Sequence, residues 1–294
     1  MDFSLQAGHS VSHSYNAGYV VLSYIVSFSG AWTALELLHR RTSARGLYNW
    51  YVLPEPRTLQ CAIDHPTCTL LLTSQRYLLL AAASSMGTVA IWSMHFIGNR
   101  AIQMASGQAK YQIEYNPGYT AGSFFLPICV VGAAFYFFST TEKVSVFATL
   151  LGGVLTGAAA CGMHYMGQGG ISNYVPVYIW GYVLGSALIS VTASTAALSI
   201  FFYLKSTWTN SWIKRMACAS LLATSVSGMH WVAAVGTAYR LKAGAGSSNN
   251  GLSRQATVIV VLCLVRNVRP CSCSLRTNIF RRHLDVVLPS SSWP

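Results

Sequence analysis

Charged residues are scarce in this chain of 294 residues. They make up 9% of the sequence, against roughly 25% in soluble domains, whereas hydrophobic residues make up 53%. Several apolar runs reach the length of about 20 residues that crosses the hydrocarbon core of a bilayer. Alternating segments of about ten residues, which build transmembrane β-barrels, are missing. We therefore predict an all-α, polytopic helical membrane protein and exclude an ordinary soluble domain.

Acidic residues are the scarcest charged groups, with 7 Asp and Glu in total. Only Glu36 and Glu142 lie near an apolar run, and no acid lies in the middle of one. A proton or solute transporter is expected to carry acids at mid-membrane. A retinal protein requires a lysine in mid-span, and that is missing too. Because no phosphate-binding glycine loop or Ser-His-Asp arrangement is recognisable either, we expect no catalytic residues and no enzymatic activity.

The net charge is +12 with histidine neutral, but Lys and Arg lie in the loops between apolar runs and in the C-terminal tail. That placement is typical of topology control by positive loops, so we expect no nucleic-acid partner. The loops after the first, third and fifth runs hold nine Lys and Arg, and the other loops and the N-terminal segment hold five. The excess predicts that the N-terminus lies outside, with 1–16 as an extracytoplasmic segment. We expect the protein to lie in the plasma membrane.

Six apolar runs are long enough to span a membrane as helices. Their approximate bounds are Ala17–Leu38, Leu78–Ile97, Gly122–Phe138, Val144–Met166, Val177–Leu204 and Met216–Tyr239. A seventh run, Ala256–Val265, stops after ten residues and is too short to cross. The prediction is therefore six transmembrane helices plus an incomplete seventh.

A tripeptide of Met, His and an aromatic residue occurs three times, near the ends of the second, fourth and sixth runs. With eight Met and eight His in 294 residues, chance predicts about 0.2 Met-His pairs. The copies are Met94-His95-Phe96, Met163-His164-Tyr165 and Met229-His230-Trp231. Their spacing of 69 and 66 residues indicates a repeated two-helix unit, and such repeats place equivalent sites around a common axis. The predicted orientation places all three copies near the outer face.

Thioether and imidazole together suit copper better than zinc, calcium or magnesium. A histidine at the edge of a membrane helix needs a partner, and a shared metal would satisfy three at once. The predicted primary ligands are His95, His164 and His230, with Met94, Met163 and Met229 as soft secondary ligands. Further candidates are Met166, His9 and His13. The aromatic third residues are assigned to the interfacial belt. The alternative is that the Met-His pairs only pack and hydrogen-bond.

The segments Trp92-Ser-Met-His-Phe-Ile-Gly-Asn99, Gly162-Met-His-Tyr-Met-Gly167 and Gly228-Met-His-Trp231 resemble the signature of the MHYT family of integral membrane sensor domains. The stretch from Gly18 to Trp50 is similar to the fungal branch, and the resemblance covers residues 8–265. It implies six or seven transmembrane helices with the motifs near the outer face, copper binding, and a response to oxygen, carbon monoxide or nitric oxide. Bacterial members are often fused to cyclic-di-nucleotide or kinase modules, and no such output module is recognisable in this sequence.

Two segments depart from the family pattern. Residues 52–76 are polar, contain Pro and Cys, and are interpreted as an insertion in the first inner loop of a sensor domain that covers 17–265. Residues 266–294 form a basic tail without periodicity, interpreted as disordered or mispredicted. Our hypothesis for both is translated intron sequence.

The resulting prediction is an integral membrane sensor or signalling protein that binds copper and responds to a diatomic gas or to redox state. Its partners are the lipid bilayer and an unidentified cytoplasmic signalling protein. Two alternatives stay open: a copper or small-solute transporter, and a structural membrane protein without metal.

Overall fold

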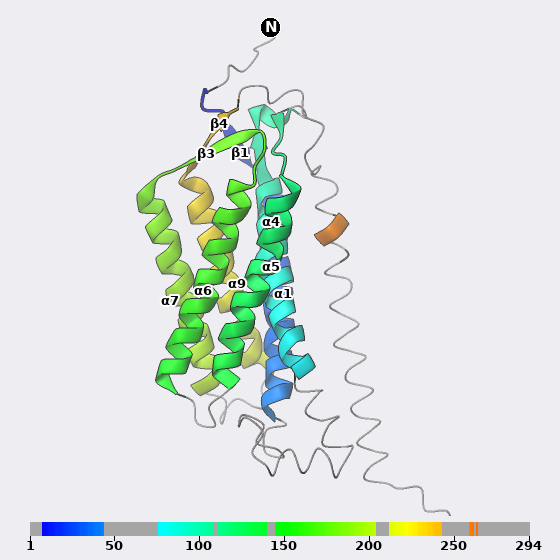
Figure 1. Cartoon of the computed structure of the whole chain (residues 1–294), viewed down its shortest axis with the longest axis vertical. Coiled ribbons are helices and arrows are strands. Elements are labelled where there is room, and N and C mark those ends of the chain that lie inside the picture. Colours follow the sequence, from blue (N-terminus) through cyan, green and yellow to red (C-terminus); the bar gives the residue numbers. More distant parts are fainter. Residues whose placement is uncertain are drawn as a thin grey trace, which may run out of the picture.

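Six long helices make up most of the molecule (Figure 1). The computed structural model describes residues 8–43, 76–108, 111–139, 145–203, 212–242, 259–261 and 263. The helices are α1 (Ala17–Ser43), a second helix over Arg76–Ala101, α5 (Pro117–Ser139), α6 (Val146–Gly169), α7 (Trp180–Tyr203) and α9 (Trp212–Val235). All six are long and apolar enough to cross a membrane, which confirms the predicted fold class and the number of spans in the described part of the chain.

Three predictions fall largely outside the described residues. The proposed insertion 52–76 and the tail 266–294 are among them. Of the seventh apolar run, only Ile259, Val260, Val261 and Cys263 are described, and they are helical. These three predictions therefore stay as they were made.

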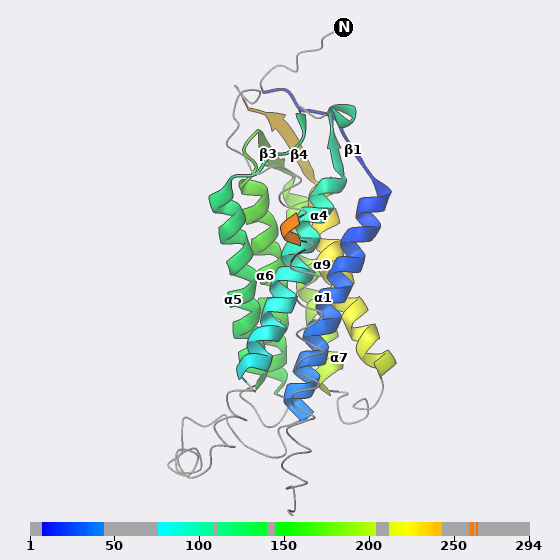
Figure 2. The same cartoon turned by 90° about the vertical axis from the view of Figure 1, so that its right-hand side faces the viewer.

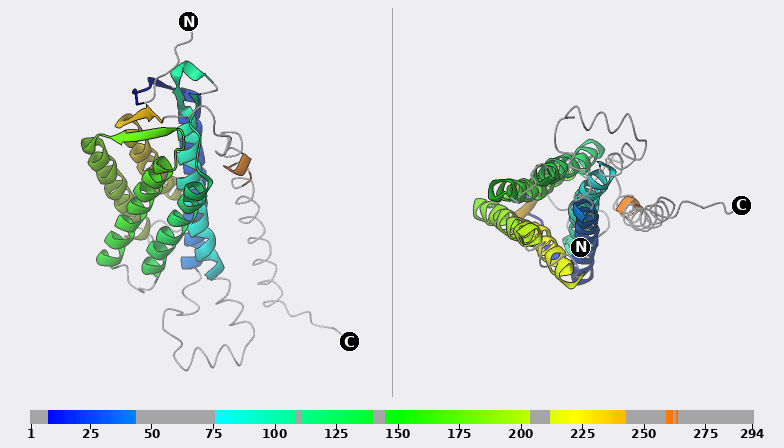
Figure 3. Two further views of the ribbon diagram at one scale, coloured as in Figure 1. Left: turned by 45° about the horizontal axis from the view of Figure 1, so that its top comes forward. Right: turned by 90° about the horizontal axis from the view of Figure 1, so that it is seen from below.

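The helices form three pairs around a central axis. Seen from below in Figure 3, the pairs trace a triangle: α1 with the second helix, α5 with α6, and α7 with α9. Each pair has one motif-bearing helix, and the three motif-bearing helices also contact one another across the axis. Within an apolar window of 18 residues in each helix, the buried share is 72, 50 and 61% for the motif-bearing helices, against 44, 28 and 28% for α1, α5 and α7. The motif-bearing helices therefore form the inside of the bundle, and their partners face outward.

The repeat is also visible where two of the three outer helices begin, at α1 and α5. Asn16 accepts hydrogen bonds through its side-chain oxygen from the N–H groups of Gly18 and Tyr19. Asn116 does the same for the N–H groups of Gly118 and Tyr119. An asparagine at this position satisfies backbone donors that the first helical turn leaves free. Because Asn116 caps α5, that helix begins at Pro117, five residues before the predicted start.

The second helix contains a wide-turn segment immediately before its motif. The π-helix η2 (Ser85–Ser93) is buried along its whole length and passes directly into α4 (Met94–Ala101). Helical periodicity in the sequence did not predict it. π-helical turns are rare and are frequent at functional sites. This one sets the rotation of α4 about its axis and hence the direction of His95.

Four short strands cover the motif end of the bundle (Figure 2). β1 (His13–Tyr15) pairs antiparallel with β2 (Ile102–Met104), and β3 (Tyr174–Tyr178) pairs antiparallel with β4 (Thr237–Leu241). The N-terminal residues bridge the two sheets, since Val11 N–H donates to the Tyr239 carbonyl and Gly8 N–H to the Leu241 carbonyl. We call Gly8–Tyr15 together with β2, β3 and β4 the strand lid.

Two predicted helix boundaries are wrong because of the strand lid. The fifth run was predicted to begin at Val177, but Val177 lies in β3 and α7 begins at Trp180. The sixth was predicted to continue to Tyr239, but α9 ends at Val235. Both errors have one cause: the apolar residues continue past the helix end, and hydropathy cannot distinguish a helix end from a buried strand of Tyr and Val.

Small residues allow the helices to approach closely. At Gly157 of α6, an added Cβ would lie 2.7 Å from the Cα of Val191 in α7. At Gly185 of α7, an added Cβ would meet nothing within 4 Å. The Val191 backbone that contacts Gly157 cannot move aside as a flexible side chain can.

We expect Gly157→Ala to destabilise the bundle by about 1–3 kcal/mol, the usual cost of overpacking. Gly185→Ala makes the same chemical change in open space and is the matched control, with stability unchanged or slightly raised by its better helix propensity. Thermal unfolding of the purified protein in detergent measures both. Equal midpoints for the two variants would contradict the close α6–α7 contact.

Candidate metal centre

The three motif histidines meet in the centre of the bundle. His95, His164 and His230 are all fully buried, and each comes from a different inner helix. Their ring centroids lie 5.0, 5.1 and 5.1 Å apart, and the ring planes are nearly perpendicular at 87°, 90° and 81°. One ligand nitrogen from each ring lies within 4.8 Å of the others. The predicted convergence of the three repeats is therefore confirmed.

The nitrogens that face each other are the Nδ1 atoms. Nδ1 of His230 lies 3.3 Å from Nδ1 of His95 and 3.1 Å from Nδ1 of His164. A neutral imidazole carries one N–H and one lone pair, so two facing Nδ1 atoms require one of them to carry the proton. A cation placed among the three would instead be bound by three lone pairs, with the protons on the Nε2 atoms. The geometry therefore fits a site with three nitrogen ligands.

The outward Nε2 atoms differ among the three rings. Nε2 of His95 lies 3.1 Å from Nδ2 of Asn99. Nε2 of His164 and Nε2 of His230 are buried and have no hydrogen-bond partner within the described ranges. A buried polar atom without a partner is unfavourable. A cation held by the three Nδ1 atoms would not satisfy these two Nε2 atoms, so the case for a metal rests on the Nδ1 geometry.

No carboxylate takes part in the cluster. In the described part of the chain the only acids are Glu36 and Glu114, and neither belongs to it. Glu36 instead pairs with Arg40 and Arg215. The charge of a bound cation would thus be stabilised by neutral ligands alone, in a buried site where uncompensated charge is expensive. This favours an ion of low charge.

Two glycines make room for the imidazole rings. A Cβ at Gly98 would lie 2.5 Å from Nε2 of His230, and a Cβ at Gly167 would lie 2.5 Å from Nε2 of His95. Each glycine stands three residues after a motif histidine, on the same face of its helix. Ala233 has the corresponding position in the third copy. The ring of one repeat therefore packs against a small residue of the next repeat.

The predicted methionine ligands are fully buried next to the histidines. Met94, Met163 and Met229 have no exposed surface, but no described contact places their sulfur atoms at the cluster. Their role as ligands stays a prediction. The end of Met166 instead lies against Gly122 of α5.

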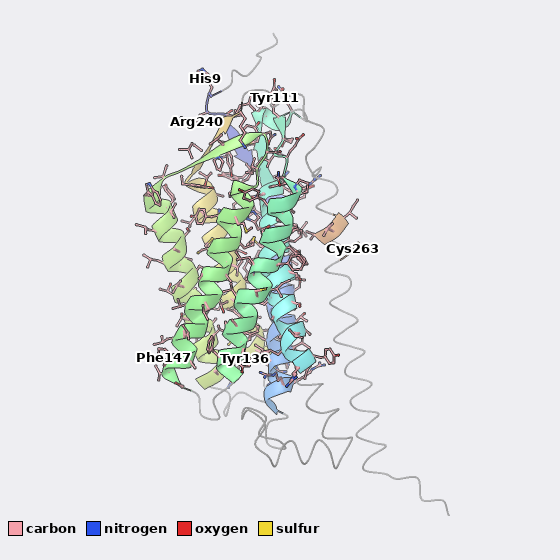
Figure 4. All side chains as sticks on the ribbon, in the orientation of Figure 1. His9, Tyr111, Tyr136, Phe147, Arg240 and Cys263 are labelled. Atoms are coloured by element: carbon pink, nitrogen blue, oxygen red, sulfur yellow. The ribbon has the colours of Figure 1, made fainter. Side chains whose placement is uncertain are left out.

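The two N-terminal histidines do not join the cluster. His13 lies in β1, where its Nε2 is 3.1 Å from the Tyr15 hydroxyl and its ring packs edge-on against Tyr239. His9 is exposed at the strand end of the molecule, near Arg240, as Figure 4 shows. Both belong to the strand lid.

The aromatic third residues of the motifs line the histidines, so the predicted role in the interfacial belt is incomplete. Phe96, Tyr165 and Trp231 each pack edge-to-face on their own histidine, with centroids 5.0, 4.9 and 4.9 Å away. Phe96 is buried and also packs on Trp92. These rings hold the imidazoles in place as well as shielding them from lipid.

Sequence reasoning missed the polar residues beside the cluster. Asn99 and Gln168 are buried, and Nε2 of Gln168 donates to Oδ1 of Asn99 over 3.4 Å. The buried Tyr239 of β4 donates its hydroxyl to Oε1 of Gln168 over 3.4 Å. A signal was available, because an amide follows the histidine by four residues in two of the three copies.

Comparisons with known proteins agree with this architecture. Residues 89–153 and 157–213 match the model of the MHYT repeat, described as a bacterial signalling protein N-terminal repeat. These ranges include the first and second motifs. The third motif lies beyond them, and the structure brings its His230 to the same site.

Two curated relatives are bacterial proteins. The bifunctional diguanylate cyclase/cyclic di-GMP phosphodiesterase MucR of Pseudomonas aeruginosa is 26% identical over 255 residues, which are 85% of this chain and 32% of MucR. The signaling protein YkoW of Bacillus subtilis is 24% identical over 227 residues, 74% of this chain and 23% of YkoW. This chain thus spans a third or less of the length of these relatives.

No solved structure matches the chain significantly. Both relatives are bacterial, so the predicted fungal branch receives no support from them. What the repeat matches do establish is narrower: this integral membrane chain carries MHYT signalling repeats.

Proposed function

We propose that this chain is a membrane sensor module that holds copper between His95, His164 and His230 and responds to a diatomic gas or to redox state. The observation that carries the proposal is the convergence of three Nδ1 atoms in a fully buried site. Three imidazoles suit copper among several transition metals. Because the cluster has neutral ligands and no acid, we further propose Cu(I) as the resident ion. Bound copper would supply redox chemistry or an open position for a small gas molecule.

We propose that the output lies with a cytoplasmic partner. The proposed orientation places the strand lid and the metal centre outside. Among the described residues, the opposite end of the bundle has Arg40, Arg41, Arg76, Lys214 and Arg215, and the lid end has Arg100, Arg240 and Lys242. This excess of positive charge supports the assignment of the opposite end to the cytoplasm. One curated relative is named a signaling protein and the other a diguanylate cyclase/cyclic di-GMP phosphodiesterase, which supports a sensor over a transporter.

The decisive measurement is the metal content of the purified protein by mass spectrometry. We expect about one copper per chain in the wild type, and none in a variant with His95, His164 and His230 all replaced by alanine. A copper-free wild type purified from copper-replete cells, with full folding, would support the purely structural alternative. Copper flux into vesicles would support the transporter instead.

A further inference from the structure

A line of hydrogen bonds leads from the histidine cluster to the strand lid. It begins at Nε2 of His95, continues through the amides of Asn99 and Gln168, and ends at the hydroxyl of Tyr239. The successive distances are 3.1, 3.4 and 3.4 Å. All four side chains are buried, so water does not compete for these contacts.

The line has two self-consistent directions, because an amide presents either its oxygen or its NH2 group by turning half a revolution. In the described direction, Tyr239 donates to Gln168, Gln168 donates to Asn99, and Asn99 donates to Nε2 of His95. Nε2 then carries a lone pair, and the single proton of the neutral imidazole is on Nδ1. In this state Nδ1 of His95 cannot bind a metal.

Metal binding requires the opposite direction. When Nδ1 of His95 gives its lone pair to a cation, its proton lies on Nε2 and needs an acceptor. Asn99 must then present Oδ1 to His95 and NH2 to Gln168. Gln168 must in turn present Oε1 to Asn99 and NH2 to Tyr239. The hydroxyl oxygen of Tyr239 changes from donor to acceptor at the far end.

We propose that Asn99 and Gln168 form a reversible amide relay that couples metal occupancy at His95 to the hydroxyl of Tyr239 in the strand lid. The proposal rests on the proposed function for its metal, and it assigns positioning roles to two residues outside the Met-His motifs. Hydrogen-bond partners of metal-bound histidines commonly fix the tautomer in this way.

The relay is specific to one of the three repeats. Nε2 of His164 and Nε2 of His230 have no hydrogen-bond partner in the described ranges, and Ala234 stands four residues after His230, where the other copies have an amide. Among the three rings, His95 is therefore the one whose tautomer is coupled through hydrogen bonds to residues beyond the cluster.

Tyr239 connects the hydrogen-bond line to the strand lid. Its backbone carbonyl accepts from Val11 N–H, and its ring packs on His13, so it joins β4 to the N-terminal segment. Burial raises the pKa of the Tyr239 hydroxyl well above its ordinary value, and nearby Tyr115 adds to this effect. The group therefore stays a neutral phenol that both donates and accepts.

The test uses Gln168→Glu, measured at a pH high enough to ionise the buried carboxyl, because a carboxylate only accepts hydrogen bonds. Glu at this position takes one bond from Tyr239 and one from the NH2 of Asn99, which turns Oδ1 of Asn99 toward His95. We expect the proton of His95 to move from Nδ1 to Nε2 even without metal. Nitrogen NMR of histidine-labelled, metal-free protein in lipid bilayers distinguishes the two tautomers.

Gln168→Met is the second variant, similar in length and without hydrogen-bonding groups. It frees Asn99 from its neighbour, and we expect His95 to become a mixture of the two tautomers. If Gln168→Glu does not fold, the tautomer of His95 in Gln168→Met alone tests the relay. An unchanged Nδ1–H tautomer in both folded variants would overturn the relay.

Copper affinity provides the second measurement, by competition with a Cu(I) chelator. We expect Gln168→Glu to tighten binding, and Asn99→Leu to weaken it about 10–100-fold, the usual range for partners of metal ligands. Tautomer shifts with no copper bound in the wild type or in either variant would sustain the hydrogen-bonded link from His95 to Tyr239, and would reject copper as its input together with the proposed function. Copper binding with no tautomer shift would sustain the function and reject the relay.

Discussion

Replacing His230 by alanine is expected to abolish copper binding. His230 is the ring whose Nδ1 contacts the Nδ1 atoms of both His95 and His164. Its loss leaves two imidazoles without the nitrogen that lies between them. We expect the affinity for Cu(I) to fall by more than about 100-fold, beyond the 10–100-fold typical of changes in outer-shell partners. Chelator competition on the purified protein measures the change.

His9→Ala is the matched control for this experiment. His9 is exposed at the strand end of the molecule and lies outside the cluster. We expect its replacement to leave copper affinity unchanged. If His230→Ala and His9→Ala bound copper equally well in folded protein, the three histidines would not form a shared site and would have only a packing role.

The sequence was sufficient for the spans and for the meeting of the histidines. Transmembrane helices follow from local composition, because backbone hydrogen bonds must be satisfied within each segment in lipid. The convergence of the histidines follows from repetition, because helices with matched motifs at matched depth place them around one axis. Neither inference requires knowledge of side-chain packing.

The details of the site depend on packing between repeats, which the sequence does not reveal. Which nitrogen of each histidine faces the centre depends on the rotation of α4, α6 and α9 about their axes. In α4 that rotation is set by the π-helical turns of η2, a non-local result of burial rather than a periodic pattern. The contact between Gln168 and Asn99 joins two repeats and could not be predicted from either alone.

The strand lid was missed for a different reason. The predicted spans run into these strands, up to Val177 in Tyr174–Tyr178 and up to Tyr239 in Thr237–Leu241, because apolar and aromatic residues continue past the helix ends. Only their pairing with each other, over 59 to 67 residues of sequence, shows that they are strands. This pairing brings Tyr239 to Gln168 beside the histidine cluster, where no sequence motif predicted a polar residue.

Gly167→Ala is expected to weaken copper binding and to destabilise the fold together. The new Cβ would lie 2.5 Å from Nε2 of His95, well inside van der Waals contact. The ring cannot easily retreat, because His164, His230 and Phe96 pack on it at centroid distances of 5.0, 5.1 and 5.0 Å. Relief of the clash must therefore displace the ring from the cluster.

The expected loss of stability for Gly167→Ala is about 1–3 kcal/mol, the usual cost of overpacking a buried site. Gly169→Ala is the matched control in the same helix, since its Cβ would meet only the Tyr119 ring at 4.0 Å. Thermal unfolding without metal isolates the packing cost, and copper titration of the same samples measures the displacement of His95. Copper affinity that is equal in the two variants would show that His95 is not a ligand, because its displacement would then have no effect on the metal.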